Sequence, residues 1–75
     1  MLRLRVKEVA REKGLSLTKL SQRSEVSYNI VKGVFRDPYR VITTYTLQKL
    51  AKALGVSALE LLEEVPDKDG VDEEA

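Results

Sequence analysis

Cysteine, histidine and tryptophan are all absent from this 75-residue chain. Without cysteine there is no disulfide framework, no thiolate nucleophile and no cysteine-rich zinc site. Without histidine there is no imidazole base and no common metal ligand. The remaining polar residues form no constellation that suggests chemistry. We therefore expect a protein that is not an enzyme and that carries neither a cofactor nor a metal.

Long apolar runs are missing as well. No stretch approaches the roughly 20 apolar residues that a membrane helix needs, and the residues after Met1 lack the apolar core of a signal peptide. An apolar content of 43% with 33% charged residues is typical of a globular domain. We expect one small cytoplasmic domain with no membrane partner.

The formal net charge of +1 conceals an uneven distribution. Residues 1–59 contain twelve basic and four acidic side chains, whereas residues 60–75 contain one basic and eight acidic side chains. The segment from Pro66 onward has too few apolar residues to offset its ordering entropy. These features predict a folded, basic domain over residues 1–65 and an acidic, disordered tail over residues 66–75.

One local pattern occurs four times in the chain. An apolar residue precedes Ser or Thr, and a second apolar residue follows the first by five positions, which matches a helix N-cap with a hydrophobic staple. The four pairs are Leu15-Ser16, Val26-Ser27, Ile42-Thr43 and Val56-Ser57. Ser57 and Glu60 also have the spacing of a capping box. Together with an amphipathic N-terminal segment, they predict an all-α domain of five short helices, near residues 2–13, 17–23, 28–36, 44–54 and 58–64, and no strand.

The second and third of these helices are separated by the short turn Ser24-Glu25-Val26. Leu20 of the first helix and Val31 of the second fall on facing apolar sides, and Val26 is expected to fill the corner between them. Two short helices joined in this way form a helix-turn-helix, which presents the outer face of its second helix to the DNA major groove.

Over roughly residues 4–64 the chain resembles the Cro/C1-type helix-turn-helix family, also called the XRE family. The resemblance rests on Gly14-Leu15-Ser16, Leu20-Ser21 and Glu25-Val26-Ser27, and more specifically on the segments Leu50 to Ser57 and Glu60 to Leu62. It implies a lambda-repressor-like domain that binds double-stranded DNA as a homodimer. Family members commonly dimerise through the last helix, so the resemblance implies an interface that includes Leu59, Leu62 and Val65. A monomer in which Leu62 or Val65 is partly exposed is the alternative.

Two departures from the family pattern lead to structural expectations. Glu25 occupies a turn position that usually holds glycine because it needs a positive φ, and a non-glycine residue there costs about 1 kcal/mol. Ala10 and Phe35 occupy positions where many members have a partly buried Arg–Glu pair. Replacing both charges by apolar groups avoids a stranded buried charge, so we expect Phe35 to pack near Ala10.

With Val31 and Val34 facing the core, the opposite side of this helix is left for DNA. We expect base contacts from Ser27, Tyr28, Asn29, Lys32 and Gly33, and phosphate contacts from Ser16, Arg36, Arg40, Thr43 and Thr44. Gly33 is explained either by a close approach of DNA to the helix backbone or by simple tolerance. For Arg40, Thr43 and Thr44 a solvated loop is an equally good interpretation.

Arg3, Lys7 and Arg11 share one face of the expected first helix, at i, i+4 and i+8. A solvated face is the preferred interpretation of this stripe, and general attraction of DNA is the alternative.

The favoured function is a sequence-specific transcriptional regulator, acting as a repressor, with no evident small-molecule effector. The alternative is an antitoxin-like or adaptor module that keeps the fold and binds protein. The acidic tail is expected to keep the chain soluble, or alternatively to compete with DNA for the basic face.

Overall fold

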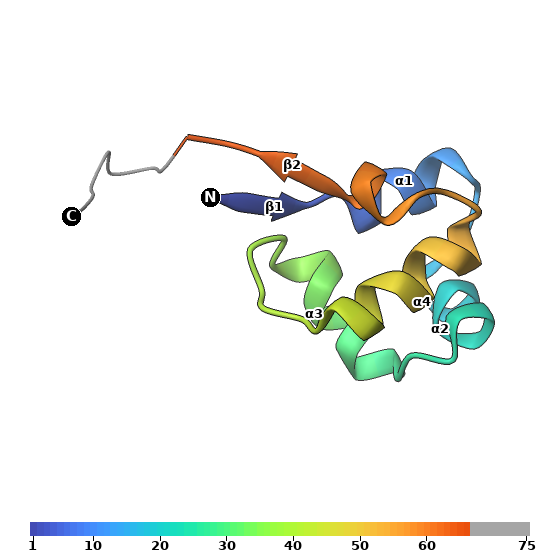
Figure 1. Ribbon diagram of the computed structural model, residues 1–75. Helices are drawn as coiled ribbons and strands as arrows, with labels where there is room; N and C mark the ends of the chain where they lie inside the picture. Colours follow the sequence, from blue (N-terminus) through green and yellow to red (C-terminus); the bar gives the residue numbers. More distant parts are fainter. Residues whose placement is uncertain (67–75) are drawn as a thin grey trace.

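Four α-helices and one short pair of β-strands make up residues 1–66, the part of the chain that the computed structural model describes (Figure 1). The elements follow one another as β1 (Leu2–Leu4), α1 (Val6–Glu12), α2 (Leu17–Ser24), α3 (Tyr28–Arg36), α4 (Thr44–Leu54), the 3-10 turn η1 (Ala58–Leu61) and β2 (Leu62–Glu64). The predicted acidic tail lies outside the described residues except for Pro66, so its behaviour stays a prediction.

All four predicted N-caps are confirmed. In each case the hydroxyl oxygen accepts a hydrogen bond from a backbone N–H within the first turn, which satisfies a donor that the helix itself leaves unpaired. The pairs are Ser16 with Lys19 at 3.2 Å, Ser27 with Ile30 at 3.3 Å, Thr43 with Thr46 at 3.1 Å and Ser57 with Leu59 at 3.2 Å. At Ser57 the donor is Leu59 and not Glu60, because the turn that follows is a 3-10 turn.

The helix-rich fold class is confirmed, but the prediction of five helices and no strand is wrong at both ends of the domain. Residues 2–4 form a strand paired antiparallel with residues 62–64, with Leu2 opposite Glu64 and Leu4 opposite Leu62. The fifth helix is a single 3-10 turn that runs directly into β2. Each strand is three residues long and its partner lies about 60 residues away. No local sequence pattern signals such a pair.

The strand pair also changes the interpretation of the basic stripe. Arg3 lies on β1, outside the helix that carries Lys7 and Arg11, and its guanidinium is 2.6 Å from the Glu8 carboxylate and 3.1 Å from that of Glu63. The hydrogen bond with Glu8 raises the pKa of Arg3 above its ordinary value. Burial raises the pKa of Glu8, but the hydrogen bond from Arg3 and neighbouring charges outweigh it, so that pKa is lowered. Through these two ion pairs, Arg3 of β1 is linked to α1 and to β2.

The core lies where α2, α3 and α4 meet beneath α1. Leu20, Val31 and Leu50 are fully buried and come from these three helices. Val26 in the turn is only 6% exposed, so it fills the corner as predicted. Phe35 is partly buried against the same core cluster, which also contains the fully buried Ala10. Phe35 therefore does not point into solvent, and its direct contact with Ala10 stays a prediction.

Glu25 adopts a left-handed conformation, with φ of 61°, and is the one non-glycine residue of the described chain with a positive φ. The turn is held by two serine side chains of α2, which precede Glu25. The Ser21 hydroxyl donates to the Val26 carbonyl at 2.7 Å, and the Val26 N–H donates to the buried Ser24 hydroxyl at 3.2 Å. These bonds position the start of α3 although the turn lacks the glycine that its backbone favours.

Replacing Glu25 by glycine is expected to raise the free energy of unfolding by about 1 kcal/mol, because glycine adopts the left-handed conformation without the Cβ penalty. For a domain of this size that corresponds to an increase in Tm of roughly 4–8 °C. Thermal unfolding followed by circular dichroism measures it. Glu12→Gly, at the last residue of α1, is the matched control and should lower Tm. A lower Tm for Glu25→Gly would contradict a strained turn.

Candidate nucleic-acid interface

Helix α3 is amphipathic, with a buried side and an exposed side that match the predicted register. Val31 and Val34 are buried, whereas Tyr28, Asn29 and Arg36 are exposed. Lys32 and Gly33 are partly exposed on the same outer side. The predicted base-contacting residues therefore share one accessible face of a nine-residue helix, and their contacts with DNA stay a prediction.

The exposed face of α3 begins at a capped helix N-terminus. The Ser27 hydroxyl accepts from the Ile30 N–H, and Tyr28 and Asn29 follow in the first turn. The N-terminal end of a helix carries partial positive charge and free N–H groups, which favour anionic oxygens. α3 has no acidic residue in its first turn, and Arg36 lies in its last turn. This face therefore carries the basic side chains Lys32 and Arg36 and no acidic side chain.

The structure brings some of the predicted phosphate-contacting residues together. Arg40 and Thr43 line a shallow groove of about 260 Å³, with Ile30 of α3 and Thr46 of α4 also in its wall. Thr43 is the N-cap of α4 and Thr44 is its first residue, and both are exposed. Ser16 is the exposed N-cap of α2, and the groove does not include it. The loop and the start of α4 thus adjoin α3.

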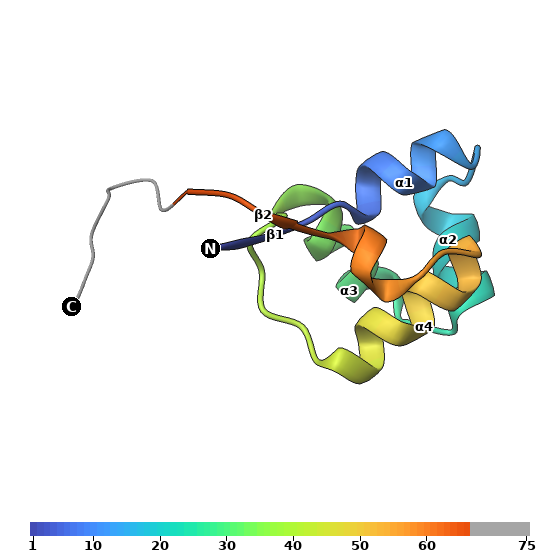
Figure 2. The same cartoon turned by 45° about the horizontal axis from the view of Figure 1, so that its top comes forward.

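The loop between α3 and α4 is fixed at both ends of its first turn. Figure 2 shows it leaving α3 close to the strands and then reaching α4. Asp37 N–H donates to the Gly33 carbonyl at 2.9 Å, and the Asp37 carboxylate accepts from the Tyr39 N–H at 3.0 Å. Arg40 N–H donates to the Asp37 carbonyl at 3.1 Å, and the Pro38 carbonyl accepts from the Leu4 N–H at 2.7 Å. The backbone at Arg40 therefore has a defined position relative to α3.

Gly33 has a neighbour that the sequence did not indicate. The Arg40 side chain lies over Gly33, and its guanidinium occupies the space that a Cβ at residue 33 would need. An approach of DNA to the backbone was one predicted reason for glycine here, and tolerance was the other. The structure supplies a third, which is room for the Arg40 side chain. A glycine in a helix seven residues before an arginine in a loop is too common a pattern to reveal this contact.

The cations on this face have no acidic partner within residues 1–66. The ion pairs of the described chain involve Arg3 and the N-terminal amine, with acidic partners in α1 and β2. Lys32, Arg36 and Arg40 form none of them. Positive charge that is not neutralised within the domain is suited to a polyanionic ligand.

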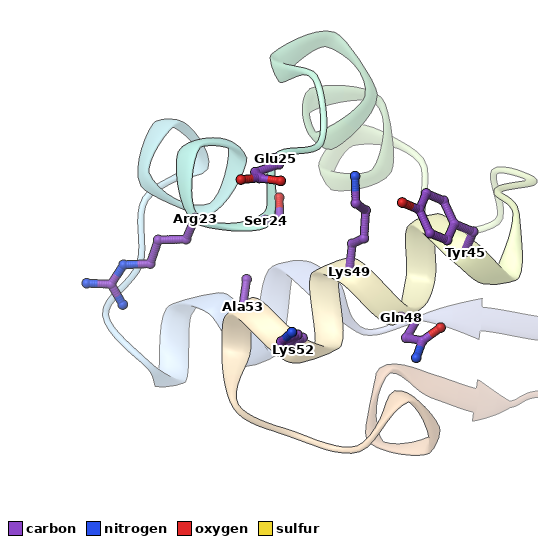
Figure 3. Close-up of a pocket in the computed structure, with 8 residues that line it drawn as sticks. All are labelled: Arg23, Ser24, Glu25, Tyr45, Gln48, Lys49, Lys52 and Ala53. Atoms are coloured by element: carbon purple, nitrogen blue, oxygen red, sulfur yellow. The ribbon is translucent and has the colours of Figure 1, made fainter.

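A second basic region lies between the end of α2 and α4 and was not singled out from the sequence. It is a hollow of about 670 Å³, and Figure 3 shows Tyr45 and Lys49 extending from the same side of α4. The ammonium group of Lys49 lies 4.9 Å from the centre of the Tyr45 ring. Arg23 and Lys52 also line this hollow, together with Glu25. None of the predicted DNA-contacting residues lies in its wall.

Within residues 1–66 no group of three or more acidic, histidine or cysteine side chains has the arrangement of a metal site. Among the described helices none is both long and apolar enough to cross a membrane.

Comparison with known protein families gives a match. A family model described as Helix-turn-helix matches residues 6–61, three quarters of the chain, and this range contains α1 to α4 and the 3-10 turn. Searches of curated proteins and of solved structures returned no match. The matched family is of the XRE type. It is a family of DNA-binding domains and not a family of enzymes. The chain therefore belongs to the Cro/C1-type (XRE) helix-turn-helix family of DNA-binding regulators.

Proposed function

We propose that this protein is a sequence-specific transcriptional repressor that occupies double-stranded DNA as a homodimer, with α3 in the major groove. The observation that carries the proposal is the exposed face of α3. This face carries Tyr28, Asn29, Lys32 and Arg36 on consecutive turns of the helix, after the N-cap Ser27. None of these side chains forms an ion pair with an acidic residue within residues 1–66. Repression by occlusion requires no activity beyond binding to DNA.

The side chains on α3 match the hydrogen-bonding groups of base edges in the major groove. Asn29 has the donor and acceptor that adenine N6 and N7 require, and Lys32 donates to guanine O6 and N7. Tyr28 packs on a thymine methyl group or donates to a phosphate. Ser27 precedes these residues at the N-cap, and Gly33 lies on the same side of α3.

Residues around α3 then fix the register of the protein on the DNA backbone. The exposed hydroxyls at the starts of α2 and α4 belong to Ser16, Thr43 and Thr44, and helix N-termini suit phosphate oxygens. Arg36 adds a cation at the end of α3. Such contacts raise affinity for every sequence alike, whereas the base contacts choose among sequences.

The second subunit is a further part of the proposal. Leu59 is 77% exposed, and Leu62 and Val65 are partly exposed along β2 and just beyond it. A two-fold pairing of these apolar side chains removes them from water. In the proposed dimer, the two copies of α3 read half-sites about one helical turn of DNA apart.

Titration of duplex DNA at several salt concentrations tests the proposal. A dimer that neutralises six or more phosphates loses about 10³-fold or more in affinity between 50 mM and 200 mM salt. We expect a decrease of this size. A flat response, or no binding even at low salt, would reject DNA binding and favour an antitoxin-like or adaptor module that binds protein.

A further inference from the structure

The position of Arg40 over Gly33 has a functional consequence, which rests on the function proposed above. We infer that Arg40 is a base-reading, specificity-determining residue, and that Gly33 is a positioning residue that seats it on α3. The structure thus assigns to Arg40 the recognition of guanine at the base pair that faces residue 33.

Gly33 lies on the row of α3 that faces outward. Asn29 is four residues before it and Arg36 three residues after it, and residues at these spacings are neighbours on one helix face. A side chain at residue 33 would therefore stand between two predicted DNA contacts. Glycine leaves that place empty in the helix itself.

Arg40 fills the empty place from the loop. Its Cζ and Cδ atoms lie 2.9 and 3.4 Å from the position of a Cβ at residue 33, and one guanidinium nitrogen is closer still. The stem of the side chain thus crosses the helix at Gly33. The turn from Asp37 to Arg40 fixes the position of the Arg40 backbone relative to α3. Its hydrogen bonds run from the Asp37 N–H to the Gly33 carbonyl, from the Tyr39 N–H to the Asp37 carboxylate and from the Arg40 N–H to the Asp37 carbonyl. The guanidinium is therefore presented from the surface of α3 although Arg40 belongs to a loop.

Seating on the helix distinguishes base reading from a phosphate contact. A long exposed arginine reaches a phosphate from many conformations and needs no gap in a helix. The planar guanidinium fork must instead be oriented to donate two parallel bonds to guanine O6 and N7. A glycine in the interior of a helix disfavours that helix, and Arg40 is the neighbour that uses the space. The carboxylates of residues 1–66 do not compete, because Arg40 has no ion pair there.

Four variants test the inference: Gly33→Ala, Arg40→Ala, Arg40→Lys and the double variant Gly33→Ala/Arg40→Ala. The probes are a duplex selected by the wild-type protein from a random pool and a duplex of random sequence with the same length. An alanine at residue 33 displaces only the flexible end of Arg40 and favours the helix. Gly33→Ala should therefore raise Tm while it weakens binding to the selected duplex by roughly tenfold.

Non-additivity is the decisive readout. When Arg40 is already alanine, Gly33→Ala should reduce the affinity for the selected duplex little further, because both changes remove the same contact. Arg40→Lys keeps the charge but lacks the planar guanidinium. It should therefore lose the preference for guanine at one position in each half-site, while its binding of the random duplex changes little. The control is Arg36→Ala, alone and combined with Gly33→Ala. In this pair the fold losses of affinity of the two single variants should multiply. A repeated selection with Arg40→Ala should give a site that differs at that base pair in each half-site.

Two results would overturn the inference. If the losses of Gly33→Ala and Arg40→Ala multiply, glycine is needed for another reason, such as a close approach of DNA. If Arg40→Ala weakens the selected and the random duplex equally, Arg40 contacts only phosphate. Both results require a wild-type protein that binds DNA. A wild-type protein without binding would reject the proposed function itself, and a nuclear Overhauser effect between Gly33 Hα and Arg40 Hδ would then still report whether the seat exists.

Discussion

Leu50→Ala is expected to lower the free energy of unfolding by about 2–5 kcal/mol, because it removes three buried carbon atoms and leaves a cavity. Leu50 is fully buried in α4, in the cluster that also contains Leu20 and Val31. A core in a chain of this length rarely supplies more than about 3–5 kcal/mol. The variant should therefore lose most of its stability at 25 °C. Urea denaturation followed by far-UV circular dichroism measures the change.

Leu59→Ala is the matched control for Leu50→Ala. The substitution is the same, but Leu59 is 77% exposed on the 3-10 turn, so its cost at low protein concentration should stay within about 0.5 kcal/mol. A cost that appears only at high protein concentration would indicate that Leu59 lies in a dimer interface. Equal destabilisation by both variants would contradict the described core.

Lys32→Ala is expected to weaken binding to the selected DNA site by about 1–3 kcal/mol, or roughly 5- to 150-fold, because the ammonium group loses its donation to guanine. Lys32 is partly exposed in the middle of α3, between Asn29 and Arg36 on the outer side. Binding to random DNA should weaken much less, since a single charge contributes only the general phosphate attraction. Fluorescence anisotropy with both duplexes gives the two affinities.

Lys52→Ala controls for the loss of one positive charge. Lys52 is exposed on α4 and lines the second basic hollow, which contains none of the predicted DNA contacts. Its replacement should reduce both affinities slightly and to the same extent. If Lys52→Ala and Lys32→Ala have equal effects on the selected site, the exposed face of α3 does not read bases.

The parts of the fold that depend on neighbouring residues could be predicted from the sequence. An N-cap hydroxyl and the staple five positions apart are local features, and Ser16, Ser27 and Thr43 begin their helices as expected. The left-handed turn at Glu25 was expected because the family pattern has glycine there. Both depend on contacts within a few residues along the chain.

The parts that depend on distant contacts could not be predicted. Leu2 to Leu4 also fit the apolar period of a helix, and only pairing with residues 62–64 makes them extended. Arg3 thereby leaves the basic stripe and joins Glu8 and Glu63. The exposed face of α3 could be predicted from its apolar period. The position of the Arg40 side chain over Gly33 could not, because it depends on the shape that Asp37 and the Leu4–Pro38 hydrogen bond give to the loop.

The central claim is that the exposed face of α3, with Arg40 seated on it, reads base edges in the major groove. Selection of bound duplexes from a random pool, first with the wild-type protein and then with Lys32→Ala, tests this claim most directly. We predict an enriched site with two related half-sites about one helical turn apart, and loss of preference at one base pair per half-site for Lys32→Ala. No enriched sequence, or the same enriched sequence for both proteins, would contradict it.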